Sequence, residues 1–130
     1  MDAASPYLRL VGRVLLAILF IQAGFHKIGG YEGLQGAMSS HGIPTILAPL
    51  VILLEFGGGI CIVLGLFTRW IALALAGFCV LAAAIYHPPT EANEMINFMK
   101  DIAIAGGFLV LAGTGPGALA LDDWLGRRRA

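Results

Sequence analysis

Charged side chains are scarce in this sequence. Asp, Glu, Lys and Arg together make up 12% of the 130 residues, and eight basic and eight acidic groups cancel to a formal net charge of zero. Soluble domains carry about 25% charged residues, so a soluble monomer is not expected. With no net positive charge, nothing in the composition suggests the basic surface with which many proteins bind nucleic acid, and we expect no nucleic-acid partner.

Hydrophobic residues take the place of the missing charge. They make up 58% of the chain, and 18 glycines accompany them, whereas aromatic residues make up only 9%. Small residues in so apolar a chain are typical of transmembrane helices, whose backbones approach each other closely at glycine. The composition therefore predicts a membrane protein with lipid as its bulk partner.

Cysteine and metal-binding motifs are also missing. Cys61 and Cys79 lie in separate apolar runs without a CxxC spacing, so a disulfide scaffold is not expected. We interpret the two thiols as small packing residues, with a redox pair between neighbouring helices as the alternative. His26, His41 and His87 match no zinc, copper or haem spacing. We interpret them as interface side chains and expect no metal site.

Long apolar runs divide the chain into four predicted membrane spans. About 20 apolar residues are needed to cross the roughly 30 Å of hydrocarbon in a bilayer. The break between the first two runs carries Leu34, Ala37 and Met38 at helical spacing, which predicts a short interfacial segment. The expected fold is all-α, a single membrane domain (1–130) built as an antiparallel four-helix bundle, with spans at about 7–28, 46–67, 70–86 and 95–114 and a polar tail at 115–130.

The basic residues predict the orientation of these spans. Arg9, Arg13, Arg69 and the run 127–129 lie on the side that holds both termini, whereas Lys27 and Lys100 lie toward the other side. Because cytoplasmic loops are enriched in Lys and Arg, we expect both termini to lie in the cytoplasm. The first span ends without a small-residue cleavage site, so we expect no cleaved signal peptide.

Several ionisable residues lie inside the predicted spans, where each costs a few kcal/mol unless it has a partner. Lys27, Glu55 and Lys100 are close enough in depth to meet, and Asp101 follows Lys100. They form either a structural ion network that fixes helix register, or a polar site for protons, a quinone head group or another small molecule. In the second case Glu55 is the candidate catalytic acid.

Arg13 belongs to the opposite half of the membrane. We expect it to pair with Asp122 or Asp123, or to extend to a lipid phosphate. It shares one helical stripe with the cation at the other end of the first span, because the intervening residues recur at steps of three and four. The stripe consists of Arg13, Ala17, Phe20, Gly24 and Lys27.

Small residues flank these charges and predict close contacts between helices, because a helix without side-chain bulk lets a neighbour approach. The candidate packing positions are Gly24, Gly57, Gly58, Gly59, Cys61, Gly65, Gly106 and Gly107.

Three segments carry a family resemblance: RLVGRVLLAILFIQAGFHKI in the first span, LEFGGGICIVLGLFTRW in the second, and MKDIAIAGGFLVLAGTGPGALALDDW near the end. From Leu8 to Trp124 the chain resembles the DoxX family of small bacterial membrane proteins. The resemblance implies a four-helix bundle in a bacterial inner membrane. It also implies an association with oxidoreductase chemistry, since related proteins are named for thiosulfate:quinone oxidoreductase subunits or linked to redox-stress complexes.

The leading functional interpretation is an accessory or scaffold subunit beside a membrane oxidoreductase or respiratory complex. The alternative is a quinone-reactive subunit in which Glu55 exchanges protons and Lys27 or Lys100 holds a quinone oxygen. A second alternative is a small-molecule transporter or lipid-binding protein with Glu55 as its coupling acid. The sequence thus leaves open whether the chain is an enzyme, and quinone is the one cofactor that its pattern suggests.

Overall fold

The computed structural model describes residues 3–86 and 95–129, and in these ranges it contains helices and no strand. The prediction of an all-α fold with four membrane-spanning helices is confirmed, since four helices are long and apolar enough to cross a bilayer. In chain order the elements are α1 (Ser5–Gly29), α2 (Tyr31–Ser40), η1 (Thr45–Leu47), α3 (Ala48–Ile52), η2 (Leu53–Gly57), α4 (Gly58–Leu64), α5 (Thr68–Tyr86), α6 (Met95–Thr114) and α7 (Leu121–Arg129).

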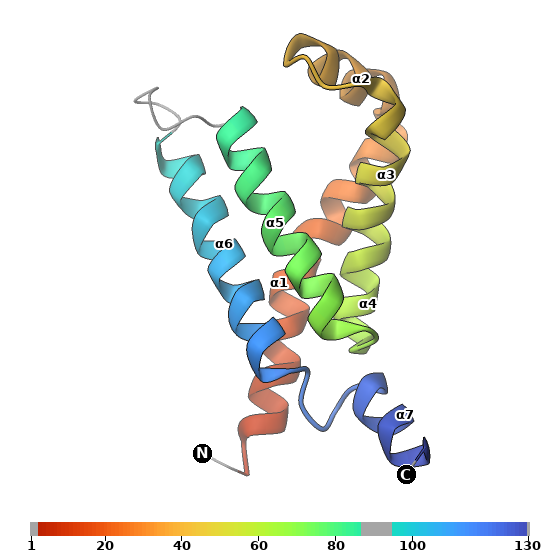
Figure 1. Ribbon diagram of the computed structural model, residues 1–130, viewed down its shortest axis with the longest axis vertical. Helices are drawn as coiled ribbons and strands as arrows, with labels where there is room; N and C mark the ends of the chain where they lie inside the picture. The colour runs from red at the N-terminus through yellow and green to blue at the C-terminus, as the bar shows by residue number, and fades with distance from the viewer. Residues whose placement is uncertain (1–2, 87–94, 130) are drawn as a thin grey trace.

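The helices form two pairs. Helix α1 packs against the span built from α3, η2 and α4, and α5 packs along α6. The two pairs diverge toward the end of the molecule where α2 lies, and α7 lies at the opposite end (Figure 1). We call these the α2 end and the α7 end.

The middle of the bundle is closed by a small aromatic and aliphatic core. Phe20 of α1 meets Phe108 of α6 edge to face, with ring centroids 5.4 Å apart and an interplanar angle of 69°. Around them lie buried alanines that let the helix axes approach, including Ala17, Ala72 and Ala105. The buried residues of α1 are Arg13, Ala17, Phe20 and Gly24, which belong to the stripe that the sequence predicts.

Large apolar side chains also cover the outside of the bundle. Leu15, Trp70 and Val110 are 66%, 75% and 66% exposed. A soluble protein rarely exposes a continuous apolar surface, whereas a bilayer solvates it. The outer surface of the four spans is therefore the surface that contacts lipid.

The second span is not one regular α-helix. It passes from the 3-10 turn η1 through α3 into the π-helical segment η2, and continues as α4. The sequence predicts a helix to residue 67, but α4 ends at Leu64 because Gly65 adopts a left-handed conformation (φ 73°). The Gly65 and Leu66 N–H groups then donate to the carbonyls of Ile62 and Cys61, which satisfies the last turn of the helix.

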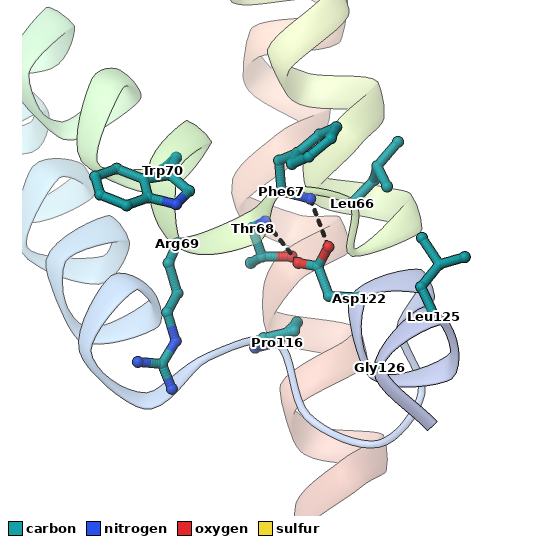
Figure 2. Close-up of a pocket in the computed structure, with 9 residues that line it drawn as sticks. All are labelled: Leu66, Phe67, Thr68, Arg69, Trp70, Pro116, Asp122, Leu125 and Gly126. Atoms are coloured by element: carbon teal, nitrogen blue, oxygen red, sulfur yellow. Dashed lines mark hydrogen bonds between the residues drawn. The ribbon is translucent and has the colours of Figure 1, made fainter. Parts of the chain in front are cut away.

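The segment that follows α6 closes the α7 end. The carboxylate of Asp122 accepts hydrogen bonds from the N–H groups of Phe67 (2.6 Å) and Thr68 (2.7 Å) at the start of α5 (Figure 2). The Asp122 N–H donates to the carbonyl of Gly65 at 2.8 Å. Asp122 therefore caps α5 from a distance of more than 50 residues in sequence and fixes the turn between α4 and α5.

Arg13 has different partners from those that the sequence predicts. Its guanidinium donates to the backbone carbonyls of Ile62 and Leu119, and the residue is only 1% exposed. No ion pair joins it to Asp122 within the described residues, where the Asp122 carboxylate already binds the start of α5. Burial also keeps this guanidinium from reaching a lipid phosphate. Arg13 instead ties α1 to the end of α4 and to the segment before α7.

Candidate functional site

A cavity of about 840 Å³ lies between the two helix pairs at the α2 end. Its wall is mostly apolar, with Leu34 and Met38 from α2, and Phe78 and Leu81 from α5. Cavities of about 300 to 1,000 Å³ with an apolar wall and a few polar groups are typical of small-molecule sites. The polar side chains that reach the wall are His26, Lys27, Tyr86 and Asp101.

A buried ion pair lies beside this cavity. The Lys27 Nζ of α1 contacts Oε1 of Glu55, and the side chain of Glu55 is 2% exposed while that of Lys27 is 31% exposed. Lys27 lines the cavity and Glu55 does not, so the lysine stands between the carboxylate and the open space. The Lys27 Nζ also lies 5.8 Å from the ring centroid of Phe78, at the distance of a cation–π contact.

Glycines determine how closely α1 approaches the span that carries Glu55. A Cβ atom on Gly24 would lie 2.7 Å from the backbone nitrogen of Phe56, which is closer than real Cβ contacts allow. A Cβ atom on Gly59 would lie 2.7 Å from the side chain of Ile21. Since Lys27 follows Gly24 by one turn on the same face, this close approach brings its ammonium group to Glu55.

Glu55 itself lies in the π-helical segment η2. A π-helical turn places one extra residue in a helix, and such turns are rare and frequent at functional sites. Here the turn directs the carboxylate into the bundle between α1 and α5, where the residue as a whole is 1% exposed. The π-helical turn and the glycine contacts therefore both position this carboxylate.

Helix α2 covers the cavity at its outer rim. The His41 ring, at the C-terminal end of α2, packs on the ring of Tyr86 at the end of α5, with centroids 4.5 Å apart. The His41 Nδ1 lies 2.9 Å from the carbonyl oxygen of Ala37. Met38 of the same helix is 2% exposed and lines the cavity. The segment expected to lie at the interface is thus a helix that forms part of the site.

The structure divides the predicted polar residues between two places. Lys27, Glu55 and Asp101 lie at or next to the cavity. Lys100 has an exposed side chain on α6 and does not line the cavity, because the neighbouring Asp101 takes the inward direction. Arg13 belongs to the α7 end with its own carbonyl partners.

The predicted packing positions also differ from one another. Besides Gly24 and Gly59, Gly65 and Gly107 lie close to neighbours, with a Cβ atom 2.9 Å from the Ala120 Cα and 3.2 Å from a Leu16 methyl group. Gly57 and Gly58 make looser side-chain contacts, at 3.4 and 3.5 Å. Gly106 does not make the close contact that the sequence predicts, since nothing in the described part of the chain lies within 4 Å of its Cβ position.

The thiols and imidazoles lie in separate places. Cys61 and Cys79 are free, and Cys79 is buried in the core. His26 lines the cavity and His41 directly follows α2, while His87 falls outside the described residues. Within residues 3–86 and 95–129, no three His, Cys, Asp or Glu residues are grouped so that they could hold a metal ion.

Sequence reasoning missed the α5 side of the cavity. Phe78, Ala82 and Ile85 all line the cavity, and their spacing of four and three residues places them on one helix face. This face and a face that contacts lipid are both apolar, so apolar character alone does not distinguish them. The aromatic residue Phe78, one turn from a small residue at Ala82, is the one sequence signal for a hollow there.

The fold and the site together define a small polytopic membrane protein with four spans and an open cavity between its two helix pairs. The family model described as DoxX matches residues 8–88, and the chain belongs to the DoxX family. It is similar to two proteins of Escherichia coli (strain K12): "Inner membrane protein YqjF", 50% identical over 92% of both chains, and "Inner membrane protein YphA", 39% identical over 92% of this chain and 91% of the relative. It is thus a multi-pass inner membrane protein.

A further relative carries a functional name. The chain is 32% identical to the "Putative oxidoreductase CatD" of Bacillus subtilis (strain 168), over 89% of this chain and 85% of that one. No solved structure matches the chain. The site geometry therefore has to be interpreted from this protein's own residues.

Proposed function

We propose that this protein is an accessory subunit of a membrane oxidoreductase and holds a quinone head group in the cavity at the α2 end. The observation that carries the proposal is the Lys27–Glu55 ion pair at the wall of an apolar cavity of about 840 Å³. An intramembrane ion pair next to an open space is a functional-site candidate by default, because burying the charges is costly.

The side chains at the cavity match the chemistry of a quinone. Lys27 has three N–H donors, and the contact with Glu55 uses one, so others are free to donate to a quinone carbonyl oxygen. Phe78 offers an aromatic surface beside that donor, and the apolar residues of α2 and α5 suit a hydrophobic ring and tail. Lys27 is then the residue that contacts the ligand, and Glu55 is a positioning residue behind it.

The oxidoreductase part of the proposal is supported by the name of the Bacillus relative, "Putative oxidoreductase CatD". We assign electron transfer to a partner protein and quinone binding to this chain. In support of this division, neither Cys61 nor Cys79 lines the cavity. The lipid-facing outer surface of the four spans is available for contact with such a partner.

Gentle native extraction, followed by mass spectrometry of bound small molecules and proteins, tests this function. We expect a quinone at about one per chain in the native protein and a co-purifying membrane oxidoreductase. Ala82→Phe fills the cavity without touching the ion pair, because Ala82 lines the cavity beside the apolar residues of α5. Steric overlap of about 1–3 kcal/mol lowers affinity by roughly one to two decades, so this variant loses the quinone.

The matched control is Ala84→Phe, on the same helix with an exposed side chain. It is expected to keep the quinone. Quinone retention by Ala82→Phe, or recovery of the native protein without any quinone, would contradict the binding site. Quinone binding without an oxidoreductase partner would contradict the accessory role alone.

We also propose that both termini face the cytoplasm. The first turn of α1 and helix α7 lie at the same end of the bundle (Figure 1), together with Arg9 and Arg69. Ser39 is exposed near the end of α2, at the opposite end. In a background with Cys61→Ala and Cys79→Ala, Ser39→Cys should react with a membrane-impermeant maleimide from the periplasmic side. Labelling of Ser39→Cys only in inverted vesicles would reverse the orientation.

A further inference from the structure

A second cavity, of about 390 Å³, lies at the α7 end (Figure 2). It is formed where the turn between α4 and α5 meets the segment after α6. Leu66, Phe67 and Leu125 form its apolar part, and Arg69 and Trp70 reach it from the start of α5. This cavity is separate from the proposed quinone site, which lies at the other end of the bundle.

Two arginines flank the loop that forms one wall of this cavity. A Cβ atom on Gly115 would lie 3.1 Å from an Nη atom of Arg69, and a Cβ atom on Gly117 would lie 2.8 Å from the Cδ of Arg9. Pro116, between these glycines, lines the cavity. Since two successive Cα–Cα steps span at most about 7.6 Å, the arginines from α1 and α5 contact two nearby positions of the same loop.

Neither guanidinium has an acidic partner in the part of the chain that the structure describes. Within the described residues, no ion pair or hydrogen bond joins Arg9 or Arg69 to another group. The acidic residue of the cavity wall, Asp122, already accepts two backbone hydrogen bonds. Figure 2 shows the Arg69 side chain extending away from Asp122, toward the loop that carries Pro116. The two arginines therefore offer unshared donors to an anion.

The wall of this cavity also contains an unpartnered buried donor. Thr68 is 0% exposed and lines the cavity, and its hydroxyl has no hydrogen-bond partner in the described part of the chain. Trp70, the next aromatic residue along α5, is 75% exposed. Tryptophan is enriched where the hydrocarbon of a bilayer meets the head groups. This places the cavity at the depth of lipid phosphates.

We infer that the cavity at the α7 end binds an anionic phospholipid. Its phosphate lies between Arg9 and Arg69, which bind phosphate oxygens with paired N–H donors. The part of its acyl chains nearest the head group lies along Leu66, Phe67 and Leu125, beside Trp70. The lipid would join α1, α5 and the segment before α7 at one point.

Fluorescence quenching by brominated lipids tests this inference. The chain has two tryptophans, so Trp124→Phe leaves Trp70 as the one reporter. The protein is placed in phosphatidylcholine nanodiscs with a small fraction of brominated phosphatidylglycerol or brominated phosphatidylcholine. We expect phosphatidylglycerol to be enriched at Trp70 by about fivefold for each arginine that contacts it. Equal quenching by the two lipids would contradict the inference without the need for any arginine variant.

Arginine variants identify the residues that recognise the lipid. In the double variant Arg9→Gln/Arg69→Gln, both brominated lipids should quench Trp70 fluorescence equally. Lys100 is an exposed basic residue in the membrane half that faces the α2 end, so Lys100→Gln should keep the preference for phosphatidylglycerol. A double variant that keeps the preference for phosphatidylglycerol would contradict recognition of the lipid by Arg9 and Arg69. The last measurement adds inorganic phosphate at constant ionic strength. If the preference for phosphatidylglycerol is then lost, the cavity at the α7 end binds free phosphate, and the lipid assignment is wrong.

Discussion

Replacing Lys27 by methionine is expected to lower the free energy of unfolding by about 3–5 kcal/mol, the range for breaking a buried ion pair from one side. Glu55, whose side chain is only 2% exposed, would then lose the cation that compensates its charge. No other lysine or arginine forms an ion pair with Glu55 in the described structure. The expected loss is measured by chemical or thermal unfolding of the purified protein in detergent.

The partner variants make this prediction sharper. Glu55→Gln should cost less than Lys27→Met, because the Lys27 side chain is 31% exposed and its ammonium group has access to water in the cavity. The double variant should cost less than the sum of the two single variants. Lys100→Met is the matched control, because its side chain is exposed on α6. Equal losses for Lys27→Met and Lys100→Met would show that the ion pair does not stabilise the bundle.

Gly24→Ala is the second substitution with a large expected effect. One methyl group at this position would lie 2.7 Å from the Phe56 nitrogen and 2.9 Å from its Cα, so the backbone of η2 or of α1 has to move. Overpacking of this kind costs about 1–3 kcal/mol. The same shift moves Lys27 away from Glu55, so we expect weaker quinone binding together with the loss of stability.

Gly12→Ala is the control on the same helix. Nothing in the described chain lies within 4 Å of its Cβ position, and alanine favours a helix over glycine by about 0.5–1 kcal/mol. Unfolding and quinone retention are measured for both variants. If Gly24→Ala melts no lower than Gly12→Ala, the close contact between α1 and η2 does not determine the site.

The sequence allows the fold to be predicted because a bilayer imposes strong constraints. Every backbone group must be satisfied within the hydrocarbon, so four apolar runs of sufficient length become four helices. The inward face of α1 is readable as well, since Arg13, Phe20 and Gly24 combine small, polar and aromatic residues at helical spacing. A charge inside a span has few favourable positions, which makes Lys27 and Glu55 natural candidates for one site.

Other features depend on information that spacing alone does not carry. The π-helical turn at Leu53–Gly57 changes the direction of every later side chain in its span, and no residue type predicts such a turn. Whether Lys100 or Asp101 faces inward depends on the rotation of α6, and adjacent residues on a helix point about 100° apart. The partners of Arg13 are the backbone carbonyls of Ile62 and Leu119, and any residue type supplies such a carbonyl. The cavity itself arises from the angle between helix pairs.

Photo-crosslinking with an azido-quinone, followed by peptide mapping, tests the proposed quinone site most directly. The reconstituted native protein is irradiated with and without an excess of unmodified quinone. We predict that label which the unmodified quinone displaces lies on the cavity-lining parts of α2 and α5, near Met38, Phe78 and Leu81. Label that is not displaced, or that lies only on outer residues such as Leu15 and Val110, would contradict a quinone site in this cavity.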